Sequence, residues 1–151
     1  MICLGIIGDT LKPIAVLDTN VLVAALRSKR GASFALLSRL TEGSFAVALS
    51  VPLLFEYEEV LSRPGMVPVS SASVQAVLDM MCKLAIHQRI HFLWRPRLRD
   101  PDDEMVLEVA AAAGAGYIVT HNVGDFRDQS LPSIRVVTPA EFLRLLPGEP
   151  S

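Results

Sequence analysis

One short stretch, residues 14–23, most constrains what this chain can fold into. It reads Ile-Ala-Val-Leu-Asp-Thr-Asn-Val-Leu-Val, so apolar residues run directly into Asp18, Thr19 and Asn20 and resume directly after them. This pattern predicts a buried parallel strand that places a carboxylate at its C-terminal end, the edge of an open α/β sheet where ligands bind. Such an Asp is suited to hold a hard cation such as Mg²⁺ or Mn²⁺, and equally to cap the helix that follows.

The composition predicts one folded domain. The chain has 151 residues, of which 51% are hydrophobic and 20% are charged, so it has enough apolar material for one core and is not a disordered chain. We expect an N-terminal extension at residues 1–12, a single domain at 13–147 and a C-terminal tail at 148–151.

The charge and the cysteines limit the partners and the compartment. A formal net charge of −2 argues against broad electrostatic binding of nucleic acid, so any nucleic acid must be held locally. Cys3 and Cys82 lack metal or redox spacing, which favours ordinary thiols in a reducing compartment. The apolar N-terminal segment has no basic region and is interrupted at Asp9, so we expect a cytoplasmic protein without a membrane partner.

Predicted strands and helices alternate along the chain. After the first strand, strands are expected at 45–49, 90–94, 117–120 and 134–137, and helices at 21–26, 33–40, 53–61, 72–86, 101–113 and 139–146. Strands separated by helices of this length require right-handed crossovers. The predicted fold class is therefore α/β, a three-layer α/β/α sandwich with a mainly parallel central sheet.

Acidic residues recur at corresponding places in this alternation. Asp18 follows the first strand, Glu56 lies in the helix after the second strand, and Asp125 follows strand 117–120. Four more acids lie at the start of helix 101–113: Asp100, Asp102, Asp103 and Glu104. Because all of these places belong to the C-terminal side of the sheet, carboxylates distant in sequence should converge there. Clustered carboxylates repel each other, and a divalent metal ion is the simplest group that neutralises them.

Several of these acids also have ordinary structural explanations. Glu56 shares the predicted buried stripe of its helix and needs a partner, whereas a solvated helix face accounts for Glu58 and Glu59. Helix capping accounts for one or two of the acids at 100–104, but four in five positions exceed that need. For Asp125, a capping or turn role is as reasonable as metal binding.

Basic and histidine residues give a weaker signal. Arg95, Arg97 and Arg99 precede the acidic cluster, and Arg27, Lys29 and Arg30 follow the first helix. These are either two solvated loops or a clamp on RNA phosphates beside the metal, with Arg97 and Arg99 as candidate substrate contacts. The three histidines, His87, His91 and His121, are interpreted as ordinary side chains, and the aromatic residues of strand 90–94 as core.

Taken together, these segments resemble the PIN-domain ribonucleases, in particular the prokaryotic toxins of toxin–antitoxin modules. The resemblance runs through residues 16–22, 54–64, 100–107, 118–120 and 137–143. It implies a metal-dependent endoribonuclease whose metal-binding and catalytic acids are Asp18, Glu56 and Asp103, with Thr19 or Asn20 as a polar helper. Many relatives have a fourth acid two residues after the strand-ending Thr, where this chain has Asn122. Thr120 to Phe126 matches another pattern of the family, which makes Asp125 the better fourth ligand and Asn122 a neutral ligand or substrate contact.

The expected chemistry is hydrolysis of RNA phosphodiester bonds with Mg²⁺ or Mn²⁺ as cofactor, and the expected partners are RNA and a cognate antitoxin. We also expect a homodimer, because the apolar stripes Phe34-Leu37-Leu40 and Leu53-Tyr57-Val60 exceed what one small core needs and the toxin relatives are typically dimers. Two alternatives remain: a catalytically weak module that binds RNA or a partner, and a Rossmann-like Mg²⁺-dependent phosphatase. Against the phosphatase, no second Asp lies two residues after Asp18.

Overall fold

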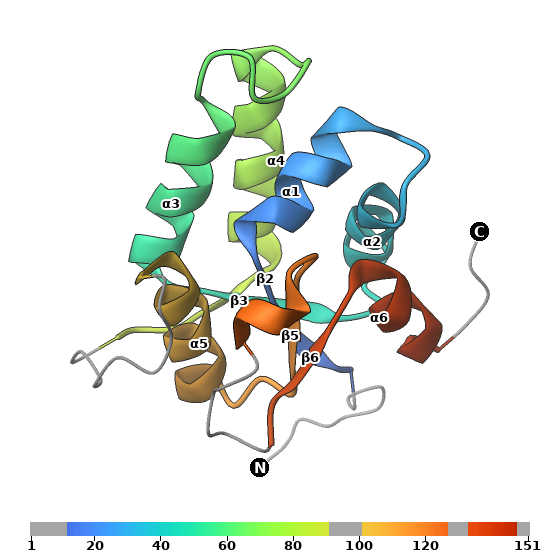
Figure 1. Cartoon of the computed structure of the whole chain (residues 1–151), viewed down its shortest axis with the longest axis vertical. Helices are drawn as coiled ribbons and strands as arrows, with labels where there is room; N and C mark the ends of the chain where they lie inside the picture. The colour runs from blue at the N-terminus through green and yellow to red at the C-terminus, as the bar shows by residue number, and fades with distance from the viewer. Residues whose placement is uncertain (1–11, 91–100, 127–132, 148–151) are drawn as a thin grey trace.

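The computed structural model describes residues 12–90, 101–126 and 133–147 (Figure 1). Its strands are β2 (Ile14–Leu17), β3 (Ala46–Leu49), β4 (Ile86–His87), β5 (Tyr117–Val119) and β6 (Arg135–Val137). Its helices are α1 (Thr19–Arg27), α2 (Ala32–Thr41), α3 (Val51–Leu61), α4 (Ser71–Leu84), α5 (Pro101–Ala113), the short 3-10 helix η1 (Val123–Phe126) and α6 (Pro139–Leu145).

The strands form one sheet in the order β4-β3-β2-β5-β6, and every pairing among the described strands is parallel. Helices lie on both sides of the sheet, with α5 packed against β2, β3 and β5 (Figure 1). The predicted three-layer α/β/α sandwich is confirmed.

The central position of β2 follows from its composition. Ala15, Val16 and Leu17 are fully buried, and a strand without polar side chains is stable only where both of its faces are covered. Its neighbours are β3 on one side and β5 on the other, with Leu17 paired to Val119 at the C-terminal edge. That edge therefore carries the residues that follow two adjacent buried strands.

Strand β4 lies at a place where the sequence pattern did not predict a strand. The structure puts β4 at Ile86–His87, where the sequence indicated the end of a helix, and Ile90 lies outside any strand. Helix α4 ends because Ala85 adopts an extended backbone, and Ile86 then pairs with Ala48 of β3. Residues 91–94 of the predicted strand lie outside the described residues.

The apolar stripes that were assigned to a dimer interface are largely used inside the molecule. Leu37, Leu40, Leu53 and Tyr57 belong to the buried core, so the reason given for that interface was wrong. The large exposed hydrophobic residues of the described ranges lie elsewhere, at Val51, Phe55, Val69, Leu84, Ile86 and Leu145. None of the helices in these ranges has the length and apolar character that a bilayer crossing requires.

Candidate functional site

The site is built where β2 and β5 end side by side. The Asp18 backbone N–H donates to the Val119 carbonyl at 2.9 Å, which holds the residue after β2 against the end of β5. Thr120 follows β5 in the same way and is anchored by its own N–H to the Val137 carbonyl, also at 2.9 Å. Two polar residues that are 102 positions apart in sequence are thereby brought into contact.

Asp18 is held by hydrogen bonds to both of its carboxylate oxygens. Its Oδ1 accepts from the Thr19 backbone N–H at 2.8 Å, so Asp18 caps α1, as one of the two interpretations of the sequence proposed. Its Oδ2 accepts from the Thr120 hydroxyl at 2.7 Å and from the Asn20 amide at 3.2 Å. Asp18 is only 8% exposed, and these hydrogen bonds replace the water contacts that its carboxylate loses on burial.

Thr120 is the residue that the sequence analysis missed. Its hydroxyl donates to Asp18 and accepts from the Asn122 backbone N–H at 3.0 Å, and it lies 3.4 Å from the Asn20 amide nitrogen. The side-chain oxygen Oδ1 of Asn20 accepts from the His121 backbone N–H at 3.2 Å, which ties the first turn of α1 to the loop after β5. The signal was present in the sequence, since Thr120 is a polar residue directly after a buried strand, as Asp18 is.

Tyr57, on α3, binds the last residue of β2 through its hydroxyl group. It is fully buried on α3, and its hydroxyl donates to the carbonyl of Leu17, the last residue of β2. Burial, followed by repulsion from Asp18, raises the pKa of the Tyr57 phenol well above its ordinary value. The phenol is therefore a permanent hydrogen-bond donor next to the Asp18 backbone.

One cleft of about 360 Å³ opens at this edge, and we call it the acidic cleft. All four acids that the sequence singled out line it, together with both of the polar helpers beside Asp18. The full lining is Asp18, Thr19, Asn20, Val23, Arg27, Glu56, Val60, Arg63, Met66, Asp102, Asp103, Asn122 and Asp125. Arg97, Arg99 and Asp100 lie outside the described residues.

Glu56 on α3 and Asp102 on α5 are neighbours in the cleft. Helix α3 is capped by Ser50, whose hydroxyl accepts from the Leu53 N–H at 3.2 Å, and Glu56 follows in the second turn. Burial raises the pKa of Glu56, and repulsion from Asp102 and Glu59 and a hydrogen bond with Asp102 raise it further, whereas Arg63 lowers it. The prediction that Glu56 shares the buried stripe of its helix was wrong, because that stripe is Leu53, Tyr57 and Leu61 and Glu56 is only partly buried beside it. Its neighbour in the cleft is another acid, which the sequence did not single out from the acids around it.

The other candidate acids come from α5 and η1. Asp103 lies in the first turn of α5 and is only 8% exposed, and it lines the cleft. Asp125 and Asn122 are exposed, and the Asp125 N–H donates to the Asn122 carbonyl at 2.9 Å within the turn that forms η1. Both side chains line the cleft, so the geometry keeps each of them as a candidate fourth group.

The donor chemistry of the cleft suits a hard divalent cation, because its acids and amides are oxygen ligands. The repulsion between Glu56 and Asp102 is also of the kind that a cation relieves. Within residues 12–90, 101–126 and 133–147, however, no three Asp, Glu, His or Cys side chains are placed to hold one ion together. Coordination by these acids would require their side chains to turn toward a common point.

The described histidines lie outside the acidic cleft. The ring nitrogen Nε2 of His87 lies 2.7 Å from the Cys82 carbonyl oxygen, and that of His121 lies 3.0 Å from the hydroxyl of buried Ser33. These contacts agree with the interpretation of both as ordinary side chains. Cys82 is a free thiol whose pKa is raised by burial and by Asp79, and Cys3 lies outside the described residues.

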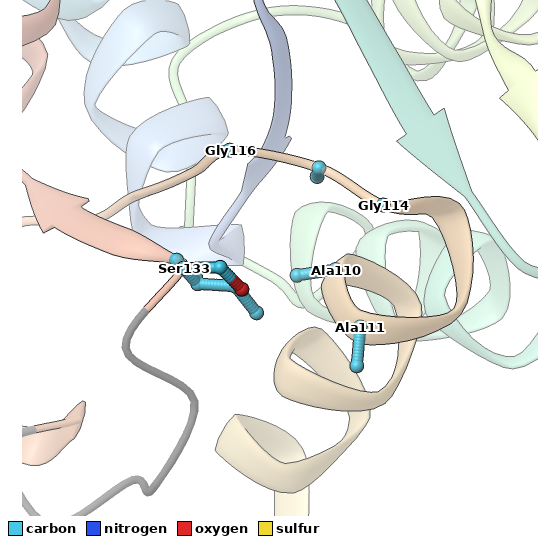
Figure 2. A pocket seen from close by; sticks show the side chains of 7 residues that line it. Ala110, Ala111, Gly114, Gly116 and Ser133 are labelled. Carbon is cyan, nitrogen blue, oxygen red and sulfur yellow. The ribbon is translucent and has the colours of Figure 1, made fainter.

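A smaller hollow of about 180 Å³ lies where α5 ends and β6 begins (Figure 2). Figure 2 shows the small side chains of Ala110, Ala111 and Ser133 around it, with Gly114 and Gly116 on the connection to β5. Its described lining carries no charged side chain, so it offers nothing that would hold a metal ion or a phosphate. The acidic cleft is therefore the better candidate for chemistry.

Comparison with known protein families matches residues 15–124 to the PIN domain. A search of curated proteins finds no match. Among solved structures, one similar chain belongs to the crystal structure of VapBC2 from Rickettsia felis bound to a DNA fragment from their promoter. That chain is 19% identical, with a TM-score of 0.59, and the alignment covers 83% of the present chain and 98% of that chain. At this identity the likeness supports the fold alone, whereas the family match extends from β2 to η1.

Proposed function

The chain belongs to the PIN-domain family, whose members are generally nucleases, and on this premise we propose that it is a divalent-metal-dependent endoribonuclease, the toxin of a toxin–antitoxin pair. The observation that carries the proposal is the acidic cleft itself. Segments far apart in sequence each contribute at least one carboxylate to its lining: Asp18 after β2, Glu56 on α3, Asp102 and Asp103 on α5, and Asp125 on η1. The toxin–antitoxin part of the proposal is made by analogy with VapBC2, a chain of which shares this fold.

In this proposal Asp18, Glu56, Asp103 and Asp125 hold Mg²⁺ or Mn²⁺. The ion, when bound, lowers the pKa of a water molecule and stabilises the negative charge that develops on the phosphodiester. The protein positions the acids: Thr120 and Asn20 fix the orientation of the Asp18 carboxylate through its Oδ2. Such supporting hydrogen bonds typically change metal affinity or activity by about 10–100-fold.

The polar residues at the rim of the cleft have separate roles. Thr19 and Asn122 line it beside the acids and are proposed as contacts to the RNA substrate. Asn20 also lines it, but its amide and carbonyl groups are used by Asp18, Thr120 and His121, so we assign it to positioning Asp18. No Ser or Cys nucleophile is among the lining residues described, so water is the proposed attacking group.

Cleavage assays on the Asp18→Asn variant test this function. The change removes one charge and almost no volume, so the fold should persist while cleavage of an unstructured RNA with Mg²⁺ or Mn²⁺ is abolished. Asp79→Asn is the matched control, because Asp79 is exposed on α4 and does not line the cleft. Wild-type activity in Asp18→Asn would refute the metal site. Activity on a small phosphate ester instead of RNA would favour the phosphatase, and RNA binding without cleavage would favour a binding module.

Metal binding has a readout that does not depend on activity. An ion that binds only the folded state stabilises it by RT ln(1 + [L]/Kd), about 2.7 kcal/mol at a hundredfold excess over Kd. The melting temperature of the wild type should therefore rise with Mn²⁺, and that of Asp18→Asn should rise less. An equal rise in both would place the ion elsewhere.

The proposed partners are RNA, a cognate antitoxin whose segment covers the acidic cleft, and a second copy of the chain. Since the Leu37 and Leu53 stripes are buried, a two-fold dimer would have to use other surfaces, such as the exposed Val51 and Phe55 of α3. Sedimentation over a range of concentrations tests the dimer, and a monomer at all concentrations would exclude it.

A further inference from the structure

The acidic cleft has a basic wall that the acids do not explain. Two arginines line it, Arg27 at the C-terminal end of α1 and Arg63 directly after α3. A cleft that only held a cation would be better without them, because a positive side chain competes with the bound metal ion. Their presence therefore calls for a negatively charged occupant in addition to the metal.

The two arginines continue two rows of residues that line the cleft, one on α1 and one that begins on α3. Helices α1 and α3 contact each other, and they begin at the C-terminal edges of adjacent strands, β2 and β3. On α1 the cleft is lined by Thr19, Val23 and Arg27, and along α3 by Glu56, Val60 and Arg63. The spacing of four residues keeps Thr19, Val23 and Arg27 on one face of α1, and Glu56 and Val60 on one face of α3. Arg63 follows just after the end of α3 and also lines the cleft.

The same spacing sets the distance between the basic wall and the acids. The eight residues of helix from Thr19 to Arg27 correspond to about 12 Å along the axis of α1. The helix from Glu56 to its end at Leu61 adds about 7–8 Å along α3, and Arg63 lies two residues beyond that end. Helical side chains lean toward the N-terminus of their helix, which here is the acidic end of the cleft. Successive nucleotides of a stacked strand rise about 3.4 Å each, so the arginines lie within about three nucleotides of the metal-binding acids.

Arg27 is fixed in position by neutral groups. Its Nε donates to the Met66 carbonyl at 2.8 Å, and its Nη2 lies 3.6 Å from the Met66 sulfur. Within the described residues no carboxylate pairs with Arg27. The loop after α3 thus orients the guanidinium without neutralising it, which leaves the charge to act on an anion in the cleft.

Arg63 makes only a weak ion pair with α3, the helix that precedes it. Its Nη2 lies 3.4 Å from Glu59, and both side chains are exposed, so the ion pair contributes little and is easily exchanged.

We propose that Arg27 and Arg63 form a phosphate subsite that holds a backbone phosphate of single-stranded RNA within about three nucleotides of the bond that is cleaved. The proposal rests on the endoribonuclease function and names the part of the substrate that this cleft recognises. A chain with a net charge of −2 repels RNA as a whole, so local cations beside the acids are needed to bind it. Both arginines position the substrate and take no part in the chemical step.

The test measures binding and cleavage separately. Arg27→Gln, Arg63→Gln and the double variant are compared with Arg30→Gln, a matched control because Arg30 is exposed near the end of α1 but does not line the cleft. Binding of a short unstructured RNA is measured in an Asp18→Asn background, so that no cleavage occurs, over a series of salt concentrations. The double variant should reduce the slope of log affinity against log salt by about 0.7, the value for one phosphate contact on a single strand, and each single variant should reduce it by less.

Cleavage by otherwise wild-type chains gives the second readout. The cleft variants should raise KM for RNA with little change in kcat, Arg27→Lys should restore much of the loss, and a dinucleotide with one phosphate should be cleaved equally by all variants. Unchanged salt slopes in the cleft variants, or the same change in Arg30→Gln, would overturn the subsite. If the chain cleaves no RNA but the slopes change as expected, the subsite is supported and the nuclease function is refuted.

Discussion

Replacing Thr120 with Val tests how far the site depends on one buried hydroxyl. The side chain keeps nearly the same shape, but the donor to Asp18 Oδ2 and the acceptor for the Asn122 N–H are removed. A hydrogen bond to a charged group contributes about 1.5–3 kcal/mol, whereas Asn122 is exposed and its N–H can turn to water. We therefore expect a loss of about 2 kcal/mol in the free energy of unfolding, which for a chain of this length lowers the melting temperature by about 4–8 °C.

The same change should weaken the metal site, because Asp18 loses the contact that orients it. We expect about a 10–100-fold loss of Mn²⁺ affinity, followed by calorimetry, and a comparable loss of RNA cleavage. Thr120→Ser keeps the hydroxyl and should retain most of both. Thr41→Val, on an exposed residue, should stay within about 0.5 kcal/mol of the wild type. A Thr120→Val protein with wild-type melting temperature and Mn²⁺ affinity would refute the role assigned to this hydroxyl.

Three further predictions concern the cleft and its support. The pKa of Glu56 is raised in the folded protein, so without metal its ionisation lowers the free energy of unfolding as pH rises above the ordinary value of 4.5. In urea titrations Glu56→Gln should therefore gain stability relative to the wild type as the pH is raised above 4.5, and equal midpoints throughout would contradict this. Asp125→Asn should weaken Mn²⁺ binding, and a gain in Asn122→Asp with no loss in Asp125→Asn would transfer the fourth ligand to position 122. Tyr57→Phe should cost about 1–3 kcal/mol by leaving the buried Leu17 carbonyl without its donor, measured by thermal unfolding, and a cost near zero would show that another group replaces it.

The local pattern of apolar and polar residues predicts most of the helices and strands of the fold. The run from Ile14 to Leu26 encodes β2, its cap and α1, because a strand buried on both faces needs continuous apolar residues and a helix start needs a capping side chain. In most of the later segments too, the spacing of apolar residues within the segment itself indicates a helix or a strand. Alternation of these elements then leaves few topologies, and a parallel sheet places the residues after its strands at one edge. That is why Asp18, Glu56, the acids at 100–104 and Asp125 are predicted to converge at one edge, whereas the choice of Asp103 among its neighbours comes from the resemblance to the PIN-domain ribonucleases.

Tertiary structure alone decided which neighbours these acids meet. Asp102 and Asp103 are adjacent in sequence, but α5 buries Asp103 and turns Asp102 toward Glu56, an outcome set by how α5 packs on the sheet. β4 lies at Ile86 because pairing with β3, and not side-chain pattern, determines where an edge strand forms. The bond between Asp18 and Thr120 joins residues 102 positions apart, and the pairing of β2 with β5, with Leu17 opposite Val119, brings them together. The apolar run of a strand buried on both faces does not say which strand lies beside it.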